Sequence, residues 1–128
     1  MSTDHISPET RVTDAMNASG MAWWEMELPS GVVFFHPNKA HMLGYKPEKF
    51  IHYTHFTELI HPEDYAQAMD AMMQHIEGKK ELYETKYRIR AADGSYRKFY
   101  DKGRIVQKLG EDTRIAGMVI DLDSISKL

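Results

Sequence analysis

Strand-forming segments around an Asp-Gly dipeptide constrain the fold of this chain more than any other feature. The segments cover residues 82–90 and 95–100, with Asp93-Gly94 between them. A tight primed turn needs positive φ, which Gly and Asp tolerate, so the pattern predicts a β-hairpin. A second reversal at 108–112 leads into the apolar segment 113–120, which predicts a third strand. The three strands form an antiparallel meander whose curved face needs a cover, and the preceding part of the chain is the expected cover.

A second hairpin is predicted closer to the N-terminus. Residues 21–28 alternate between the two faces of a strand, which places Trp23 and Trp24 on opposite sides. The Pro-Ser-Gly sequence at 29–31 turns the chain into another strand over 32–35. The face expected to meet the core carries Ala22, Trp24, Met26 and Leu28.

Between residues 37 and 78 the apolar period changes from two to about 3.6, which predicts helices. Short helical pieces are followed by a long helix that begins at His61-Pro62. Pro is tolerated in a first turn, and two acids follow at the positive end of the helix dipole. The long helix ends at Gly78, and its apolar stripe is the expected partner of the sheet. The stripe consists of Tyr65, Met69, Met72 and Ile76.

A further helix is predicted before the first strand. Ser7 is a favourable N-cap, Pro8 is tolerated at the first helical position, and Gly20 is a favourable stop. Its weak apolar stripe contains Val12 and Met16. Because such a helix is marginal alone, we expect it to pack on the sheet or on a second subunit.

The order of the elements predicts an α+β fold. It is a five-stranded antiparallel sheet with several short helices and one long helix on one face, plus the N-terminal helix. Two strands precede the helices and three follow them, so the first and last strands are expected to lie side by side. In that arrangement residues 115–120 pair with residues 22–28.

Composition limits the classes of function. The 128 residues suffice for one domain, and a formal net charge of -3 gives no reason to expect nucleic acid, whose binding needs a basic excess. No apolar run approaches the roughly 20 residues of a membrane span, and the first residues lack a signal-peptide core. Cysteine is absent, which excludes disulfides, thiolate metal sites and cysteine nucleophiles. The expected location is cytoplasmic.

Five short motifs are spread along the chain, and each is weak alone. They are Trp24-Glu25-Met26-Glu27-Leu28 followed by Gly31, Asn38 to Tyr45 with Pro47-Glu48, His61-Pro62-Glu63-Asp64, Tyr87 to Arg97, and Gly117 to Asp121. In this order and spacing they resemble the motifs of PAS domains, of the subgroup found in bacterial and archaeal sensor kinases and cyclases. The resemblance runs from about Val12 to Asp123 and covers most of the chain.

The resemblance implies a domain used for sensing or protein–protein contact. In that family the aspartate at the position of Asp121 closes the last strand and couples it to an exit helix that drives an output domain. The implied division is 1–20 as an N-terminal helical cap, 21–123 as the PAS sensor domain and 124–128 as the start of an exit linker. No output domain follows Leu128, so we expect either a fragment of a longer protein or a chain that acts by association alone.

The Met-rich, aromatic interior suggests a small-molecule pocket between the sheet and the long helix. Adaptable Met side chains suit a pocket and a filled core equally, and a filled core is the preferred interpretation of the same residues. The predicted lining residues are Trp24, Met42, Leu59, Tyr65, Met69, Met72, Tyr87 and Ile89.

The residue types of the chain give little reason to expect a bound cofactor or metal ion. Without cysteine, a flavin adduct and a thioester-linked chromophore are excluded, whereas non-covalent flavin is not. Haem-binding relatives take a histidine from the long helix, but His75 lies about 80° from the centre of the apolar stripe and is expected at the solvent edge. His52, His55 and His61 lack the thiolates common at structural zinc, and His61 is the expected cap of the long helix.

The preferred hypothesis is a sensor module of a signal-transduction protein, such as a histidine kinase of a two-component system. A small molecule or partner would alter dimer packing, with Val12 and Met16 at a homodimer interface and Asp121 as the coupling residue. The alternative is a constitutive interaction module with a filled core and no ligand. An isomerase-like enzyme would need a polar group in the pocket, for which Tyr65 and Tyr87 are the candidates. No catalytic constellation is recognisable, so we expect no enzymatic activity.

Overall fold

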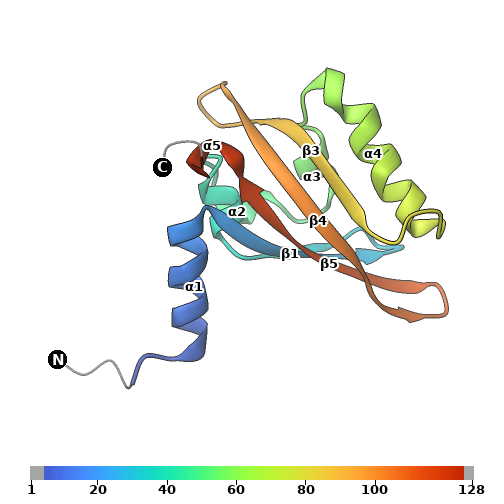
Figure 1. The fold of residues 1–128 in the computed structure, drawn as a ribbon, viewed down its shortest axis with the longest axis horizontal. Helices are drawn as coiled ribbons and strands as arrows, with labels where there is room; N and C mark the ends of the chain where they lie inside the picture. Colours follow the sequence, from blue (N-terminus) through green and yellow to red (C-terminus); the bar gives the residue numbers. More distant parts are fainter. Residues whose placement is uncertain (1–4, 126–128) are drawn as a thin grey trace.

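A curved antiparallel sheet forms the body of the molecule in the computed structural model, which describes residues 5–125 (Figure 1). Its five strands lie in the order β2-β1-β5-β4-β3, so the α+β prediction is confirmed. The hairpin around Asp93-Gly94 joins β3 to β4, as predicted, and β4 extends well beyond the expected segment. The strands are β1 (Met21–Leu28), β2 (Val33–Phe35), β3 (Tyr83–Arg90), β4 (Tyr96–Leu109) and β5 (Asp112–Asp121).

The first and last strands pair side by side, as predicted. β1 and β5 are antiparallel partners from Met21 opposite Ile120 to Leu28 opposite Thr113. Trp24 lies on the inner face of this pair and is buried, whereas Trp23 on the outer face is 37% exposed. The alternation along β1 therefore specified which face meets the core.

The connection between β2 and β3 covers the inner face of the sheet. It contains α2 (Asn38–His41), the 3₁₀ turn η1 (Pro47–Lys49), α3 (Thr54–Thr57) and the long helix α4 (Pro62–Ile76). α4 packs along β3 (Figure 1). In the core, Phe50 and Phe56 stack with ring centroids 4.0 Å apart. The core therefore lies between one sheet face and this helical cover.

Helix α4 is rotated relative to the prediction, and the assignment of Tyr65 to the covered stripe is wrong. Tyr65 is 45% exposed, whereas Ala68 and His75 are buried. Polar anchors set the rotation: Arg88 Nε lies 2.9 Å from Asp64 Oδ2, and Ile105 N–H donates to His75 Nε2 over 2.9 Å. The apolar period of the helix cannot predict these hydrogen bonds, because their partners come from other segments of the chain.

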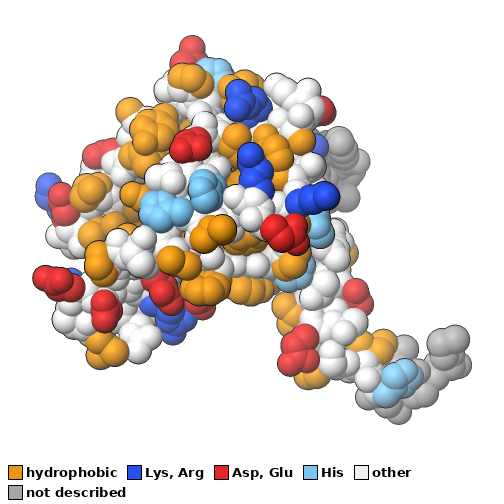
Figure 2. Space-filling view, turned by 180° about the vertical axis from the view of Figure 1, so that it is seen from behind, with side chains coloured by type: hydrophobic (Ala, Val, Ile, Leu, Met, Phe, Trp, Pro, Cys, Tyr) orange, Lys and Arg blue, Asp and Glu red, His pale blue; other side chains and the backbone are white. Residues whose placement is uncertain are grey.

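The N-terminal helix α1 (Pro8–Ser19) projects away from the sheet and its cover (Figures 1 and 2). Ser7 caps it by accepting from the Thr10 N–H over 3.1 Å, and Gly20 ends it with φ 66°, both as predicted. Val12 is 51% exposed, but Met16 is buried within the chain itself.

A short helix, α5 (Leu122–Ile125), follows β5 directly. Parts of the predicted N-terminal cap and exit linker, residues 1–4 and 126–128, lie outside the described residues. Over the described range 5–125, no helix has the length and apolarity that crossing a membrane would take.

Candidate functional site

A cavity of about 400 Å³, partly open to solvent, lies between the inner face of the sheet and helices α3 and α4. The interior is therefore not completely filled. Most of its wall is apolar, and four buried ionisable or hydroxyl-bearing side chains from α2, β3 and β4 also reach it. The apolar wall includes Met26, Phe35, Phe56, Ile60, Met69, Met72, Ile76 and Ile89, and the polar groups are Lys39, Asp101 and the hydroxyl ends of Tyr83 and Tyr87, beside Trp24.

Asp101 on β4 organises the polar end of the cavity. Its carboxylate is 5% exposed and accepts hydrogen bonds from three side chains. The Trp24 indole donates to Oδ1 over 2.6 Å, and the hydroxyls of Tyr87 and Tyr83 donate to Oδ2 over 2.9 and 3.4 Å. Three donors satisfy a buried carboxylate that would otherwise be strongly destabilising.

Burial governs the protonation of this cluster. It raises the pKa of Asp101, and the nearby charge of Lys39 and the three donors oppose the rise. Burial next to the Asp101 carboxylate also raises the pKa values of Tyr83 and Tyr87 well above their ordinary range. Both tyrosines therefore keep their protons and act as hydrogen-bond donors.

Lys39 places a cation in the same cavity. The side chain comes from α2, is 7% exposed, and holds its Nζ 3.9 Å from the centroid of Phe56 and 5.8 Å from that of Trp24. Burial lowers the pKa of this ammonium group, and the charge of Asp101 raises it. Among the residues that the structure describes, Nζ has ring contacts but no hydrogen bond or ion pair within 4.0 Å.

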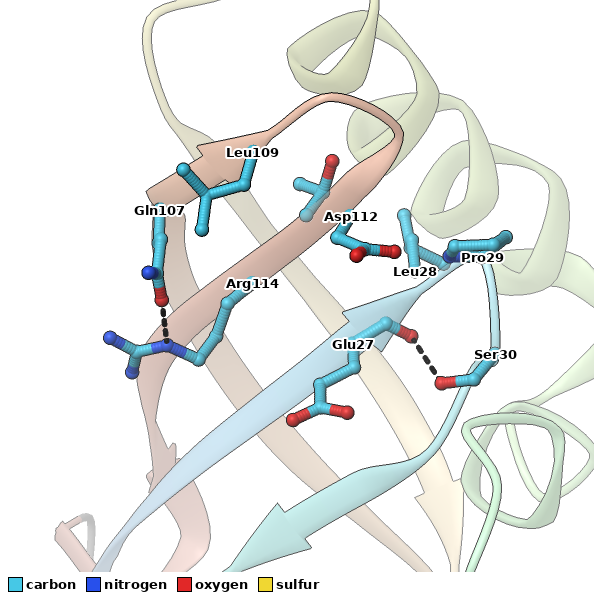
Figure 3. Close-up of a pocket in the computed structure, with 9 residues that line it drawn as sticks. Glu27, Leu28, Pro29, Ser30, Gln107, Leu109, Asp112 and Arg114 are labelled. Atoms are coloured by element: carbon cyan, nitrogen blue, oxygen red, sulfur yellow. Dashed lines mark hydrogen bonds between the residues drawn. The ribbon is translucent and has the colours of Figure 1, made fainter.

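A second hollow, of about 590 Å³, opens at the far end of the sheet (Figure 3). It lies between the end of β1 and the β4–β5 hairpin. Its polar groups bond to one another: Arg114 Nε donates to Gln107 Oε1 over 3.3 Å, and Ser30 Oγ to the Glu27 carbonyl over 3.5 Å. Because this second hollow lacks a converging cluster of buried polar groups, the cavity between the sheet and α4 is the better candidate site.

Five of the eight predicted lining residues border the cavity between the sheet and α4: Trp24, Met69, Met72, Tyr87 and Ile89. Met42, Leu59 and Tyr65 do not. Leu59 is buried elsewhere in the core, Met42 is half-buried behind α2, and the rotation of α4 leaves Tyr65 at the surface.

The sequence interpretation missed Lys39, Tyr83 and Asp101, which carry most of the polarity of the cavity. A signal for Asp101 was present, because alternation continued past Phe99 turns residue 101 inward. The predicted strand ended at residue 100, one position before Asp101, whereas β4 continues to Leu109. For Lys39 no local signal existed, since a lysine on a short helix is ordinarily solvated.

His75 is a structural histidine, and its predicted place at the solvent edge is wrong. It is 7% exposed, its Nδ1 lies 3.0 Å from the Lys80 carbonyl oxygen, and its Nε2 accepts from the Ile105 N–H. The Nδ1 therefore carries the proton, and both ring nitrogens are engaged in tying the end of α4 to β4.

Other histidine side chains also accept hydrogen bonds from backbone N–H groups. His61 caps α4, as predicted, by accepting from the Glu63 N–H over 3.0 Å. His55 Nδ1 accepts from the N–H groups of Ile51 and His52. Within residues 5–125, no group of three or more His, Asp or Glu side chains is arranged to hold a metal ion.

Asp121 joins both ends of the domain. It is 2% exposed, forms an ion pair with Arg97, and accepts at Oδ1 from the Asp123 N–H over 3.0 Å at the start of α5. Its own N–H donates to the Gly20 carbonyl oxygen over 2.8 Å, directly after α1. The end of α1, the end of β5 and the start of α5 therefore meet at this residue.

The fold and the site define an α+β domain with a polar cluster enclosed beneath an open antiparallel sheet. A family model described as the PAS fold matches residues 32–119, and the chain belongs to that family. The family assignment made from the five motifs is thereby confirmed. A search of curated protein sequences found no significant match.

Several solved structures share this fold. A sensory box histidine kinase/response regulator from Burkholderia thailandensis is 24% identical, with TM-score 0.72 and coverage of 91% of this chain and 88% of the other. The N-terminal domain of a diguanylate cyclase with PAS/PAC sensor from Marinobacter aquaeolei is 19% identical, with TM-score 0.74 and coverage of 83% and 98%. A PAS domain from Colwellia psychrerythraea is 14% identical, with TM-score 0.65 and coverage of 90% and 97%. At these identities the likeness concerns the fold.

Proposed function

We propose that this PAS domain senses a small molecule in the cavity between the sheet and α4 and passes the signal to the exit helix α5. The observation that carries the proposal is the position of Asp101 at the cavity and two residues from Phe99, which pairs with Asp121 across β4 and β5. A structural change at Asp101 would therefore reach α5 through the paired strands β4 and β5. The role is transmission of a signal and involves no catalysis.

The junction at Asp121 supports the second half of the proposal. Arg97 on β4 pairs with Asp121, and Lys98 donates its N–H to Asp123 Oδ2 over 3.0 Å. A shift of β4 against β5 would therefore change the start of α5 and, through Gly20, the end of α1. Rearrangement at strand and helix ends is a common way for a packed domain to switch.

The output is proposed to be a covalently linked domain in the full protein, as the names of the histidine kinase and cyclase neighbours suggest. The cytoplasm is the proposed compartment. A homodimer through α1 is the proposed assembly, with exposed Val12 as its contact. Met16 is already buried in its own chain and is therefore a weaker contact than the sequence suggested.

The constitutive interaction module stays as the second candidate, because α1 offers an exposed apolar side chain at Val12 whatever the cavity holds. The two candidates differ in whether occupancy of the cavity changes α5. A cavity of about 400 Å³ with an inward polar cluster favours the sensor.

Native mass spectrometry of protein purified without refolding, combined with hydrogen exchange, tests the proposal. We expect small apolar compounds that bind the cavity to change amide exchange in residues 8–20 and 121–125. Ala68→Met, which adds volume at a buried lining position, is expected to abolish binding, whereas Asp121→Asn is expected to bind normally but to lose the change in exchange. Binding that leaves exchange at both helices unaltered in the native protein would contradict the proposed transmission.

A further inference from the structure

Some polar groups that line the cavity already have hydrogen-bond partners, whereas Lys39 has none among the described residues. Each donor around Asp101 is committed, because the Trp24 indole and both tyrosine hydroxyls already donate to the carboxylate. The ammonium of Lys39 can donate three hydrogen bonds; among the described residues it contacts two aromatic rings and feels the charge of Asp101, but it makes no hydrogen bond. A ligand that fits this cavity should therefore bring a hydrogen-bond acceptor.

The charges of the cavity limit the ligand further. Lys39 and Asp101 supply one buried charge of each sign, and Glu25, which also lines the cavity, is paired with Arg114 over 2.8 Å, so the charges are balanced before anything binds. A carboxylate ligand would put a second negative charge near Asp101, and a cationic ligand would add an uncompensated positive charge near Lys39. Either addition is costly beside charged groups as buried as Lys39 and Asp101, which are 7% and 5% exposed. An uncharged ligand avoids both costs.

The residues that line the cavity limit the size of a ligand and favour a particular shape. The volume of about 400 Å³ lies toward the small end of ligand cavities, which span about 300–1,000 Å³. Met69 and Met72 are flexible and polarizable, and Phe56 presents its ring on the side that holds the lysine. These side chains suit a flat or aromatic body.

We propose that the cavity binds a small, uncharged, mainly apolar molecule whose carbonyl-type oxygen accepts a hydrogen bond from Lys39 Nζ. The proposal rests on the proposed function, since it requires the cavity to be a ligand site. In it Lys39 determines specificity, while the Asp101 cluster balances its charge and holds the polar end of the cavity in place. Loss of the Lys39 donor would leave an apolar cavity that prefers hydrocarbons.

Three naphthalene compounds substituted at the same ring position separate the alternatives by calorimetry. Acetylnaphthalene carries the carbonyl, ethylnaphthalene has the same shape without an acceptor, and naphthoate carries a negative charge. We expect the native protein to bind acetylnaphthalene about tenfold more tightly than ethylnaphthalene, the value of one good hydrogen bond, and naphthoate most weakly. Lys39→Met should remove the preference for the ketone and keep binding of the hydrocarbon, and Lys39→Arg should keep the preference.

A second measurement needs no variant. The carbonyl stretching band of isotopically labelled acetylnaphthalene should move to lower frequency in the native complex than in an apolar solvent. An unshifted band, tighter binding of naphthoate than of the ketone, or an unchanged preference in Lys39→Met would overturn the ligand class while the cavity remained a ligand site. Absence of binding by all three compounds, with native and Ala68→Met proteins alike, would overturn the cavity as a ligand site and this inference with it.

Discussion

The indole Nε1 of Trp24 lies 2.6 Å from Oδ1 of Asp101, although the two residues are 77 positions apart in the chain. This hydrogen bond crosses the inner face of the sheet from β1 to β4 and passes over β5 between them. It joins the strand that follows α1 to the strand that carries the polar end of the cavity. The first prediction concerns this bond.

Replacing Asp101 by leucine should destabilise the domain, because three buried donors would lose their acceptor. We expect a loss of about 3 kcal/mol in the free energy of unfolding, since each unsatisfied buried group costs about 1–3 kcal/mol and the costs are not additive. Asp101→Asn keeps one oxygen acceptor and should lose less. Urea denaturation measures both, and a leucine variant as stable as the native protein would show that the cluster contributes no net stability.

Gly117 should tolerate no side chain. A Cβ at this position would lie 2.2 Å from the Lys102 carbonyl oxygen and 2.5 Å from Cζ2 of Trp24. Gly117→Ala must therefore push the indole away from Asp101, at a cost of about 1–3 kcal/mol for overpacking. The altered environment of Trp24 should appear in near-ultraviolet circular dichroism in a Trp23→Phe background.

Gly110 supplies the control for that substitution. Nothing lies within 4 Å of a Cβ there, so Gly110→Ala is limited to the strain of φ 61°, about 1 kcal/mol. Its aromatic circular dichroism should match that of the native protein. The idea that Trp24 needs a glycine beneath it fails if both alanine variants leave the aromatic spectrum unaltered.

His75→Leu should loosen the contact between α4 and β4. The substitution removes the acceptor for the Ile105 N–H, and an unsatisfied buried donor costs about 1–3 kcal/mol. His75→Gln offers a carbonyl oxygen at a similar reach and should recover part of the loss. Hydrogen exchange at Ile105 is the direct measurement, and equal protection in native and leucine proteins would contradict the anchoring role.

The ion pair at the start of α4 should make the free energy of unfolding depend on pH in the acid range. Hydrogen bonds from Arg88 lower the pKa of Asp64 from 3.8 to about 2. A carboxyl group whose pKa is lower in the folded state contributes stability above its ordinary pKa and loses it as pH falls toward the lowered value. Between pH 3.8 and about 2 the native protein should therefore lose stability more steeply than Asp64→Asn, as followed by thermal unfolding. Parallel pH profiles would argue against this assignment.

Val12→Asp should weaken self-association if α1 forms the dimer. Val12 is exposed in the single chain, so a charge there should reduce association without unfolding the domain. Asn17→Asp places the same charge on an exposed position roughly 140° around the helix and serves as the control. Sedimentation velocity measures both, and a Val12→Asp protein with the native oligomeric state would exclude this contact.

Local chemistry determined much of the fold from the sequence alone. The hairpin at Asp93-Gly94, the alternation along 21–28 and the caps at Ser7, Gly20 and His61 depend on neighbouring residues, and each formed as predicted. The hairpin turn is not the predicted two-residue primed turn, because Gly94 has φ 87° while Asp93 has no positive φ. Positive φ, period and capping are properties of a few consecutive residues. For that reason the sequence alone indicates the strands, the helix starts and the family.

The tertiary structure decided the site. The rotation of α4 depends on Asp64 meeting Arg88 and His75 meeting Ile105, and the cavity polarity depends on Lys39, Tyr83 and Asp101 meeting from three elements. A periodic pattern reports the average burial of a face and carries no information about which distant polar group will satisfy a buried one. The sequence therefore determined where strands and helices form, and long-range pairing of buried polar groups determined what the cavity presents.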